Sequence, residues 1–405
     1  MAKRGTILQT RLEADQPTVS PLGPPQSWRL IPLEEVTLRT PQIDPARNPK
    51  PKFKYVDVSA ISNEFLEIIG STEYTRSEAP SRARKTIREG DILFATVRPS
   101  LKRIAVVPTQ LDGQVCSTAF CVIRANQEMA DQGFLFYAVS SDDFVGRVAA
   151  NERGVSYPAV TDRVVLRETV ALPPLEEQRE IAVALSVIRR AQKATRGIIE
   201  TAREMKKSLM ASSFSNGGWP RGTLGSVATM IMGQSPPSEF YNTSGEGLPF
   251  LQGKAEFSER HPIPTKYCTQ KLKLAPEGSV LMSVRAPVGD TNLADREYVI
   301  GRGVAALQLN GGSNEFLFYL LTYMKPQVEA LGSGTTFDSV NKGSLAQLEV
   351  PVPPVEEQLR ISTMLSTVDK KVTAEELRLA ELTDLYQSLS SALLTGRIRI
   401  PTKGS

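Results

Sequence analysis

The sequence predicts an α+β fold: two β-rich domains separated by two long helices that form an antiparallel coiled coil, with a pseudo-twofold internal repeat. One observation is a phrase that occurs twice, as Leu172–Ile181 (LPPLEEQREI) and, 180 residues later, as Val352–Ile361 (VPPVEEQLRI). A second is the heptad spacing of apolar residues after each copy, and a third is the set of short apolar runs before each copy. A repeat of this length indicates a duplicated domain rather than a solenoid unit.

The repeat extends in both directions from the phrase. C-terminally it stays in register without a gap, and N-terminally it needs small shifts, since Phe134–Tyr137 recurs as Phe316–Tyr319, both FLFY. The only two tryptophans, Trp28 and Trp219, lie at matching places. Each copy is therefore a globular part of roughly 145 residues followed by about 40 helical residues.

The segment after each phrase has the spacing of a coiled-coil helix, because apolar or small residues recur at alternating steps of three and four. The first seam comprises Ile181, Ala184, Ile188, Ala191, Thr195, Ile198, Ala202, Met205 and Leu209; the second comprises Leu365, Val368, Val372, Glu375, Leu379, Leu382, Tyr386, Leu389 and Leu393, broken only by Glu375. An amphipathic helix packed on its own domain is the alternative. Two such helices most simply pair with each other, and antiparallel pairing implies two equivalent docking surfaces for partners.

The duplicated phrase itself has the features of a junction between a domain and a helix. Pro-Pro suits a helix start because proline fixes φ and gives up an N–H that would have no partner there. The glutamate pairs 176–177 and 356–357 then place negative charge at the positive end of the helix macrodipole. Glycines predict helix ends near 216–218 and near 395–396.

These features divide the chain into an N-terminal arm (1–27), a first globular domain (28–172), a central helical spacer (173–216), a second globular domain (217–352) and a C-terminal helical spacer with tail (353–405). Short apolar runs bounded by Gly and Pro predict strands at Asp91–Val97, Ala119–Ile123 and Gly278–Val284. The segments Phe134–Val139 and Phe316–Leu321 are predicted as short helices.

The composition is that of a globular protein, with 40% hydrophobic and 23% charged residues. No apolar run approaches the ~18–20 residues of a membrane span. The N-terminus lacks a secretory apolar core, so we expect a cytoplasmic protein. The three cysteines are too few and scattered for a disulfide framework or a zinc cluster, and Cys116 and Cys121 are expected to be reduced, strand-buried thiols. The net charge of +4 permits nucleic-acid binding without demanding it.

The common catalytic motifs are missing. No GxxxxGK[ST] phosphate loop occurs, and the single histidine, His261, excludes HExxH metal sites and Ser-His triads. The Asn-Pro-Pro-aromatic motif of amino-methyltransferases is also absent, because Lys50 follows Asn48-Pro49. We therefore expect a binding protein with no catalytic residue, cofactor or metal of its own, while a carboxylate-based nuclease stays open.

The repeated motifs resemble those of a known family. Two similar domains, each followed by PP-[LV]-EEQ and a long helix, are similar to the specificity subunit of a Type I restriction–modification system. The closing phrase Leu393–Arg397 (LLTGR) and the segments Gly90–Leu93 and Gly278–Leu281 add to the resemblance, which covers residues 28–400. The second copy departs from the pattern at Ser279, where the first has Asp91; this is interpreted as a harmless change at a strand edge.

The resemblance implies a non-catalytic subunit whose two target recognition domains each read one half of a bipartite target in double-stranded DNA. It also implies partners: two methyltransferase subunits, which would bind S-adenosylmethionine themselves, and nuclease–translocase subunits that join this core. No membrane partner is expected. A helix of about 36 residues is on the order of 54 Å long, which corresponds to about 16 base pairs of duplex. The helices would then set an unread spacer between the two half-sites.

Basic and polar residues in predicted loops are the candidates for DNA contact. Arginine pairs bidentately with guanine, whereas phosphates accept from any cation. The candidates are Arg76, Arg82, Arg84, Lys85, Arg98, Lys102 and Arg103 in the first domain, and Gln234, Lys254, Arg260, Lys266, Arg285, Arg302, Thr335 and Thr336 in the second. Arg76 and Arg98 are predicted to contact base edges. Arg98 and Arg285 follow valine at equivalent strand ends, although a structural salt bridge explains that repetition equally.

Other interpretations remain open at this point. Any single basic residue can be an ordinary solvated surface charge. The segment Ser117–Phe120 is either a loop presented to DNA or a buried strand. At the level of function, the alternative is a duplicated coiled-coil scaffold that clamps two protein partners without reading DNA.

Overall fold

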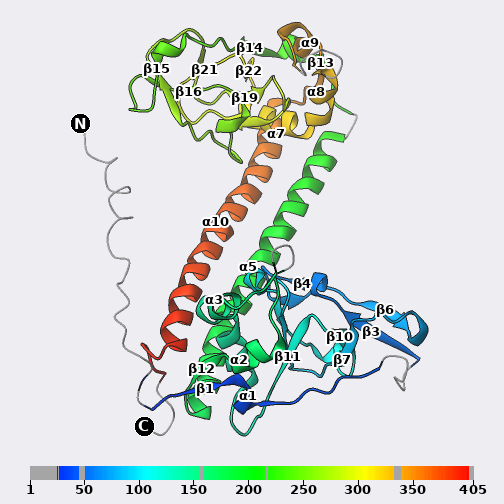
Figure 1. Ribbon diagram of the computed structural model, residues 1–405. Helices are drawn as coiled ribbons and strands as arrows, with labels where there is room; N and C mark the ends of the chain where they lie inside the picture. Colours follow the sequence, from blue (N-terminus) through cyan, green and yellow to red (C-terminus); the bar gives the residue numbers. More distant parts are fainter. Residues whose placement is uncertain are drawn as a thin grey trace. The chain divides into compact units, whose positions relative to one another are not determined.

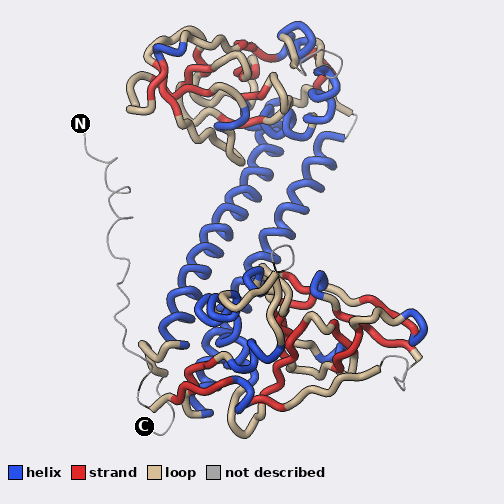
Figure 2. The backbone as a smooth tube through the Cα atoms, in the orientation of Figure 1, coloured by secondary structure: helices blue, strands red, loops and turns tan. Residues whose placement is uncertain are grey.

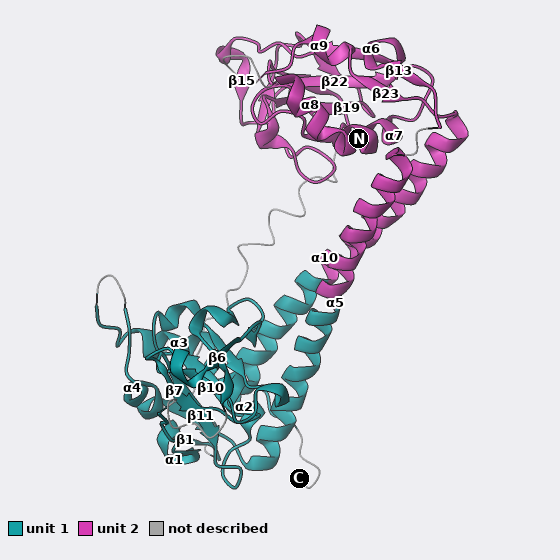
Figure 3. Ribbon diagram, turned by 90° about the vertical axis from the view of Figure 1, so that its right-hand side faces the viewer, with its two compact units in different colours: residues 1–194, 379–405 teal, residues 195–378 magenta. Residues whose placement is uncertain are grey.

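The computed structural model describes residues 25, 27–44, 51–154, 158–215, 218–332 and 339–400. The chain divides into two compact units, each treated by itself below (Figure 3). Unit 1 comprises residues 1–194 and 379–405, and unit 2 comprises residues 195–378. The predicted arm, 1–27, lies almost wholly outside the described residues.

Unit 1 contains two four-stranded sheets, with strand orders β2-β11-β8-β9 and β6-β3-β10-β7 (Figures 1 and 2). Its strands are β1 (Arg29–Pro32), β2 (Thr37–Leu38), β3 (Lys52–Val56), β4 (Ile61–Ser62), β5 (Glu67–Ile68), β6 (Thr72–Thr75), β7 (Ala83–Thr86), β8 (Ile92–Ala95), β9 (Ile104–Val106), β10 (Val115–Ser117), β11 (Phe120–Ala125) and β12 (Thr169–Leu172). Its short helices are α1 (Leu33–Val36), α2 (Gln132–Ser140), α3 (Asp142–Ala149), α4 (Asp162–Arg167) and the 3-10 turns η2 (Val58–Ala60), η3 (Arg76–Glu78), η4 (Pro99–Leu101) and η5 (Thr109–Leu111). β1 pairs antiparallel with β12, so the first and last strands of the domain lie side by side.

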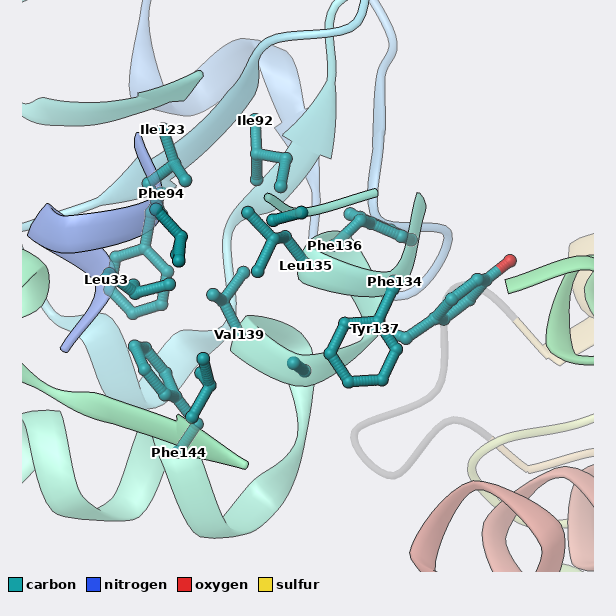
Figure 4. Close-up of a cluster of buried hydrophobic side chains, with 14 of the residues drawn as sticks. Leu33, Ile92, Phe94, Ile123, Phe134, Leu135, Phe136, Tyr137, Val139 and Phe144 are labelled. Carbon is teal, nitrogen blue, oxygen red and sulfur yellow. The ribbon is translucent and has the colours of Figure 1, made fainter. Parts of the chain in front are cut away.

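The core of unit 1 lies under α2, which packs on β9 and β11 (Figure 4). The predicted strand at Asp91–Val97 is confirmed as β8, and all four of its residues are buried because it lies between β11 and β9. The rings of Phe94 and Phe144 meet edge to face at 6.0 Å, a favourable arrangement for aromatic pairs. The predicted helix at Phe134–Val139 is confirmed as α2, capped by the Asp131 carboxylate.

Unit 2 repeats the order of these two sheets, as β14-β22-β19-β20 and β15-β17-β16-β21-β18, with β15 as an additional edge strand in the second sheet. Its strands are β13 (Arg221–Thr223), β14 (Ala228–Met232), β15 (Tyr241–Asn242), β16 (Leu248–Leu251), β17 (Lys266–Cys268), β18 (Leu274–Ala275), β19 (Val280–Ser283), β20 (Thr291–Leu293), β21 (Tyr298–Ile300), β22 (Val304–Leu309) and β23 (Glu349–Pro351). Its short helices are α6 (Leu224–Val227), α7 (Asn314–Tyr323), α8 (Lys325–Gly332), α9 (Lys342–Ala346), η6 (Ser238–Phe240) and η7 (Lys254–Glu256). The predicted strand at Gly278–Val284 and helix at Phe316–Leu321 are thus confirmed as β19 and α7.

The two long helices are α5 (Leu175–Ser215) and α10 (Val355–Leu394). In unit 1, the Gln192 side-chain amide donates to Leu382 O and Thr383 Oγ1, each at 3.3 Å. In unit 2, Arg203 pairs with Glu376 at 2.6 Å and Lys206 with Asp369 at 2.5 Å. Because the partner numbers fall as the α5 numbers rise, the helices run antiparallel within unit 2.

The predicted seam holds along α10 but shifts along α5. On α10 the interrupting Glu375 is 5% exposed and lies in the stripe as predicted. On α5, Ile198 and Met205 are 39% and 53% exposed, whereas Ile199 and Met210 are buried. The stripe therefore moves by one residue in unit 2, where the C-terminal part of α5 packs on the domain core.

The duplicated phrase forms the predicted helix start and also anchors the domain. Gln178 is 1% exposed; its Oε1 accepts from Asp131 N at 2.8 Å and its amide donates to Pro173 O at 2.8 Å. Gln358 repeats this arrangement in unit 2, with Ser313 N at 3.0 Å and Pro353 O at 3.0 Å. In each unit the glutamine thus connects the long helix to the N-cap of the short helix on the domain.

Glu177, beside this glutamine, has a second role that the sequence analysis did not predict. It is 2% exposed and accepts from Trp28 Nε1 at 3.3 Å and from the Arg399 guanidinium at 2.7 Å. Its counterpart Glu357 pairs with Arg360 on its own helix at 2.9 Å. In unit 1 the negative charge of Glu177 at the start of α5 therefore also holds Arg399, near the C-terminus, through an ion pair.

We expect Gln178→Ala to lower the free energy of unfolding by about 2–3 kcal/mol, because it leaves a buried N–H and buried carbonyls without partners. Urea unfolding followed by circular dichroism measures this. Gln387→Ala, at an exposed position of α10, is the matched control and is expected to change stability by less than about 0.5 kcal/mol. Equal effects of the two substitutions would contradict the anchoring role.

Candidate nucleic-acid interface

In unit 1 the first candidates lie in the connection between β6 and β7. Arg76 begins η3 and Arg82 precedes β7, and both side chains are exposed. A cation at a solvent-facing turn is accessible to a phosphate oxygen. The geometry of this connection therefore suits contact with a nucleic-acid backbone.

Arg84 and Lys85 lie on strand β7, so the prediction that they lie in a loop is wrong. Lys85 is 4% exposed; its ammonium donates to Phe120 O at 2.5 Å and pairs with Asp162. Arg84 pairs with Asp44 at 3.0 Å. A buried ammonium is stable only when it is paired, and Lys85 finds its partners inside unit 1. DNA contact by these two residues stays an untested prediction.

The next three candidates follow β8. Arg98 is exposed and has a left-handed backbone conformation with φ 48°. Lys102 is half-buried and pairs with Asp142. The Arg103 guanidinium donates to two backbone carbonyl oxygens, of which that of Ile61 lies at 2.8 Å. Of this group, Arg98 is the most solvent-facing, whereas Arg103 is used in holding the domain together.

Arg260 in unit 2 connects a loop to two helices. Its guanidinium donates to Tyr319 Oη at 2.9 Å, pairs with Asp369 of α10 at 3.4 Å and also pairs with Glu315 of α7. Burial, together with the hydrogen bond to Asp369, raises the pKa of Tyr319 above its ordinary range. Arg260 therefore supports the fold of unit 2, and Lys254 is likewise paired, with Asp290 at 2.8 Å.

Four further candidates of unit 2 are exposed: Gln234, Lys266, Arg285 and Arg302. Arg285 follows β19 as Arg98 follows β8, and it makes no ion pair with any residue in the described ranges. The structure therefore gives no sign of the salt bridge that was the alternative explanation for Arg285. The remaining candidates, Thr335 and Thr336, lie outside the described residues.

Gln234 and Arg302 line the same hollow, which has a volume of ≈ 710 Å³. We call this hollow the bowl; its other polar lining residues are Ser235, Ser238, Tyr241, Gln252 and Gln270. Each of its three glutamines comes from the residues just after a strand: β14, β16 and β17. Sequence reasoning missed Gln252 and Gln270 because nothing in the linear order places them beside Gln234 and Arg302.

The segment Ser117–Phe120 combines features of both alternatives. Ser117 ends β10 and Phe120 begins β11, and both are fully buried, whereas Thr118 and Ala119 form the turn between the strands, with Thr118 exposed. Cys116, Cys121 and Cys268 are free thiols buried on strands. Burial raises the pKa of Cys116 and of Cys121 well above the usual thiol range, which leaves both unreactive.

Two other kinds of site are not found in the described ranges. No group of three or more His, Cys, Asp or Glu side chains there is placed to hold a metal ion. No helix there has the length and apolar character needed to cross a bilayer.

Comparison with known proteins gives a consistent result. The family model described as the Type I restriction modification DNA specificity domain matches twice, at residues 25–203 and 216–384. A putative Type I restriction enzyme specificity subunit, MjaX, from Methanocaldococcus jannaschii is 30% identical, over 93% of this chain and 95% of that protein. The MjaVIII specificity subunit of the same organism is 22% identical over 82% of this chain and 85% of that protein.

Solved structures show the same likeness. One, from a study of the assembly and conformational transition of the Type I restriction–modification system, is 41% identical, has a TM-score of 0.61 and covers 93% of this chain and 100% of that one. The HsdS subunit of Thermoanaerobacter tengcongensis is 42% identical with a TM-score of 0.50, covering 94% of this chain and 99% of that one. Both copies of the repeat match the family model, and the chain therefore belongs to the Type I restriction–modification DNA specificity family.

Proposed function

We propose that this chain is the non-catalytic DNA-recognition subunit of a Type I restriction–modification complex. The observation that carries the proposal is the duplication: one domain topology occurs twice, each copy is joined to a long helix, and each copy matches the DNA specificity family. Each domain, 28–172 and 217–352, reads one half of a bipartite duplex target. The helical spacers, 173–216 and 353–405, set the distance between the halves.

The proposed partners follow from the division of the chain into recognition domains and helical spacers. Two methyltransferase subunits dock on the helical spacers and supply the methyl donor, and nuclease–translocase subunits join that core in the cytoplasm. The chain itself positions its partners. Phosphate contacts come from exposed cations such as Arg82 in unit 1 and Lys266 in unit 2, and in unit 1 the exposed Arg76 and Arg98 contact base edges. Phosphate contacts fix orientation, whereas base contacts specify sequence.

The test is to co-express the chain with its cognate methyltransferase and to map methylated adenines by single-molecule sequencing. A split motif with two defined halves and a fixed unread spacer is expected. A single continuous motif would count against bipartite reading, and methylation with no sequence preference would favour the scaffold alternative.

Exchanging residues 28–172 for the equivalent domain of another family member is expected to change one half-site and to leave the other half and the spacer unchanged. The reason is that the domain closes on itself through the β1–β12 pair, so its recognition surface travels with it. The same methylation map measures the result. A change in both halves would show that the domains do not read independently.

A further inference from the structure

We infer that the bowl of unit 2 reads purine edges in the major groove of its half-site, with Arg302 facing a guanine and Gln252 facing an adenine. The inference rests on the proposed function and goes further, because it names the base-reading residues and the bases that they select.

Parallel strands bring the two main residues to one edge of the sheet. β16 and β21 pair in parallel with Leu251 opposite Ile300, so Gln252 and Arg302 leave the sheet in the same direction. The segment after β14 joins them, since Gln234 N donates to Ile300 O at 2.9 Å. Arg302 N in turn donates to Ser235 Oγ at 3.2 Å.

Glycines allow the three segments to approach within backbone contact. A Cβ on Gly233 would lie 2.1 Å from Gly301 O, and a Cβ on Gly303 would lie 2.4 Å from Gln252 O. Atoms at those distances overlap, so only glycine fits at positions 233 and 303. The side chains of Gln234, Gln252 and Arg302 are therefore carried on rigidly held backbone, which lowers the entropic cost of binding.

Among the described residues, the polar side chains of the bowl are of two kinds: those of Ser235 and Tyr241 are hydrogen-bonded within unit 2, whereas those of its glutamines and arginine are not. Within the described ranges, the side chains of Gln234, Gln252 and Arg302 make no hydrogen bond or ion pair with another side chain or with the backbone. Gln270 Oε1 is buried and has no hydrogen-bond partner there either. The exposed side chains are thus available to a ligand, and a buried oxygen without a partner, such as that of Gln270, is expected where a ligand completes the hydrogen bond.

The composition of the bowl selects purines. Its lining contains three glutamines and one arginine, and none of its lining residues is a carboxylate. Arginine fits guanine O6 and N7, glutamine fits adenine N6 and N7, and the cytosine amino group calls for a carboxylate acceptor. Lys271 and Lys273 alternate in sequence with the lining residues Gln270 and Leu272, and both are exposed and suited to the flanking phosphates.

The experiment uses the complete complex of this chain with its methyltransferase, and single-molecule sequencing of the methylated motif. Arg302→Ala is expected to make one guanine position degenerate, with discrimination falling about 10-fold or more, because one bidentate contact is lost. Gln252→Glu is expected to remove the preference for adenine at one position, because a carboxylate cannot donate to N7. Arg296→Ala, at an exposed arginine of the same unit that does not line the bowl, is the matched control and should leave the motif unchanged.

The outcomes separate the inference from the proposed function. Failure of the wild-type complex to give any split motif would remove the proposed function itself. A wild-type split motif that stays intact in both bowl variants would overturn the inference alone. If Arg302→Ala abolishes methylation, competition binding with all four bases at the guanine position decides: selective loss for guanine supports base reading, and equal weakening for the four bases overturns it.

Discussion

Replacing Asp91 by alanine is expected to lower the free energy of unfolding by about 3–5 kcal/mol, because it leaves a nearly buried arginine without its counter-charge. Asp91 and Arg124 are 2% and 12% exposed at the side chain and share two hydrogen bonds, of 2.8 and 2.6 Å. Asp91 also accepts from Arg88 N at 2.8 Å. In the native protein the hydrogen bond to Asp91 raises the pKa of Arg124. Arginine stays protonated in proteins even without such a partner, so deprotonation cannot relieve the unpaired charge in the variant. Urea unfolding of the purified chain measures the effect.

Unit 2 supplies the control for this prediction. Ser279 occupies the place of Asp91, and the strand registers put Gln308 at the place of Arg124. Serine is therefore harmless there because the charged partner has been replaced as well. The double substitution Asp91→Ser with Arg124→Gln is expected to recover most of the stability lost in Asp91→Ala. A double variant as unstable as the single one would show that packing, and not the unpaired charge, causes the loss.

The prediction of strands and short helices succeeded because local signals and burial agree. The apolar runs at β8 and β19 are bounded by glycine and proline, and these two strands and β11 lie in sheet interiors. The FLFY segments became α2 and α7 because each has a side-chain N-cap, from Asp131 and from Ser313. In both cases no distant residue was needed to decide the outcome.

The seam of α5 needed information that the pattern does not contain. At two places along α5 a predicted seam residue has an apolar neighbour in the sequence: Ile198 is followed by Ile199, and Leu209 by Met210. Packing of α5 against the domain decides which neighbour is buried. At the end of the helix, for example, the ring centroids of Phe214 and Phe316 lie 5.7 Å apart. Heptad counting alone therefore places the seam to within one residue.

Some candidate contact residues are already paired within the protein, and their partners lie far away in the sequence. Lys85 is paired with Asp162 and Arg260 with Asp369, and neither carboxylate is near its cation in the chain. A basic residue in sequence therefore does not reveal whether its charge is already balanced. Gln252 became a candidate only when the topology placed it beside Arg302.

The repeat also predicts two equivalent docking surfaces for partners, and this stays a prediction; the two copies do differ in one surface region next to the FLFY helix. In unit 1 a groove of ≈ 740 Å³ is lined by Ser141, Ser390 and Leu394, among others. The equivalent positions in unit 2 are Tyr323, Met210 and Phe214, and the rings of Tyr323 and Phe214 lie 5.4 Å apart in the packed core. The duplicated sequence thus conserves the fold of the two surfaces, while the size of a few side chains makes one open and the other filled.

Adding one helical turn to both long helices is expected to widen the unread spacer of the target without changing either half-site. Four residues in each helix add about 6 Å, or one to two base pairs. Four residues also return the apolar stripe to within about 40° of its original direction, so the pairing tolerates them as a local stutter. Insertions after Ala194 and after Arg378 lie where each helix passes from one unit to the other. The methylation map of the co-expressed complex measures the spacer directly.

Two controls isolate the helices as the cause. The same four residues inserted at Gly311, an exposed turn between β22 and α7, lengthen the chain without lengthening a helix and should leave the spacer unchanged. An insertion in α5 alone shifts residues such as Arg203 and Lys206 out of register with Glu376 and Asp369, so it should lower the unfolding temperature and abolish methylation. A paired insertion that preserves folding and methylation but leaves the spacer at its original length would show that something other than the helices sets the distance between the half-sites.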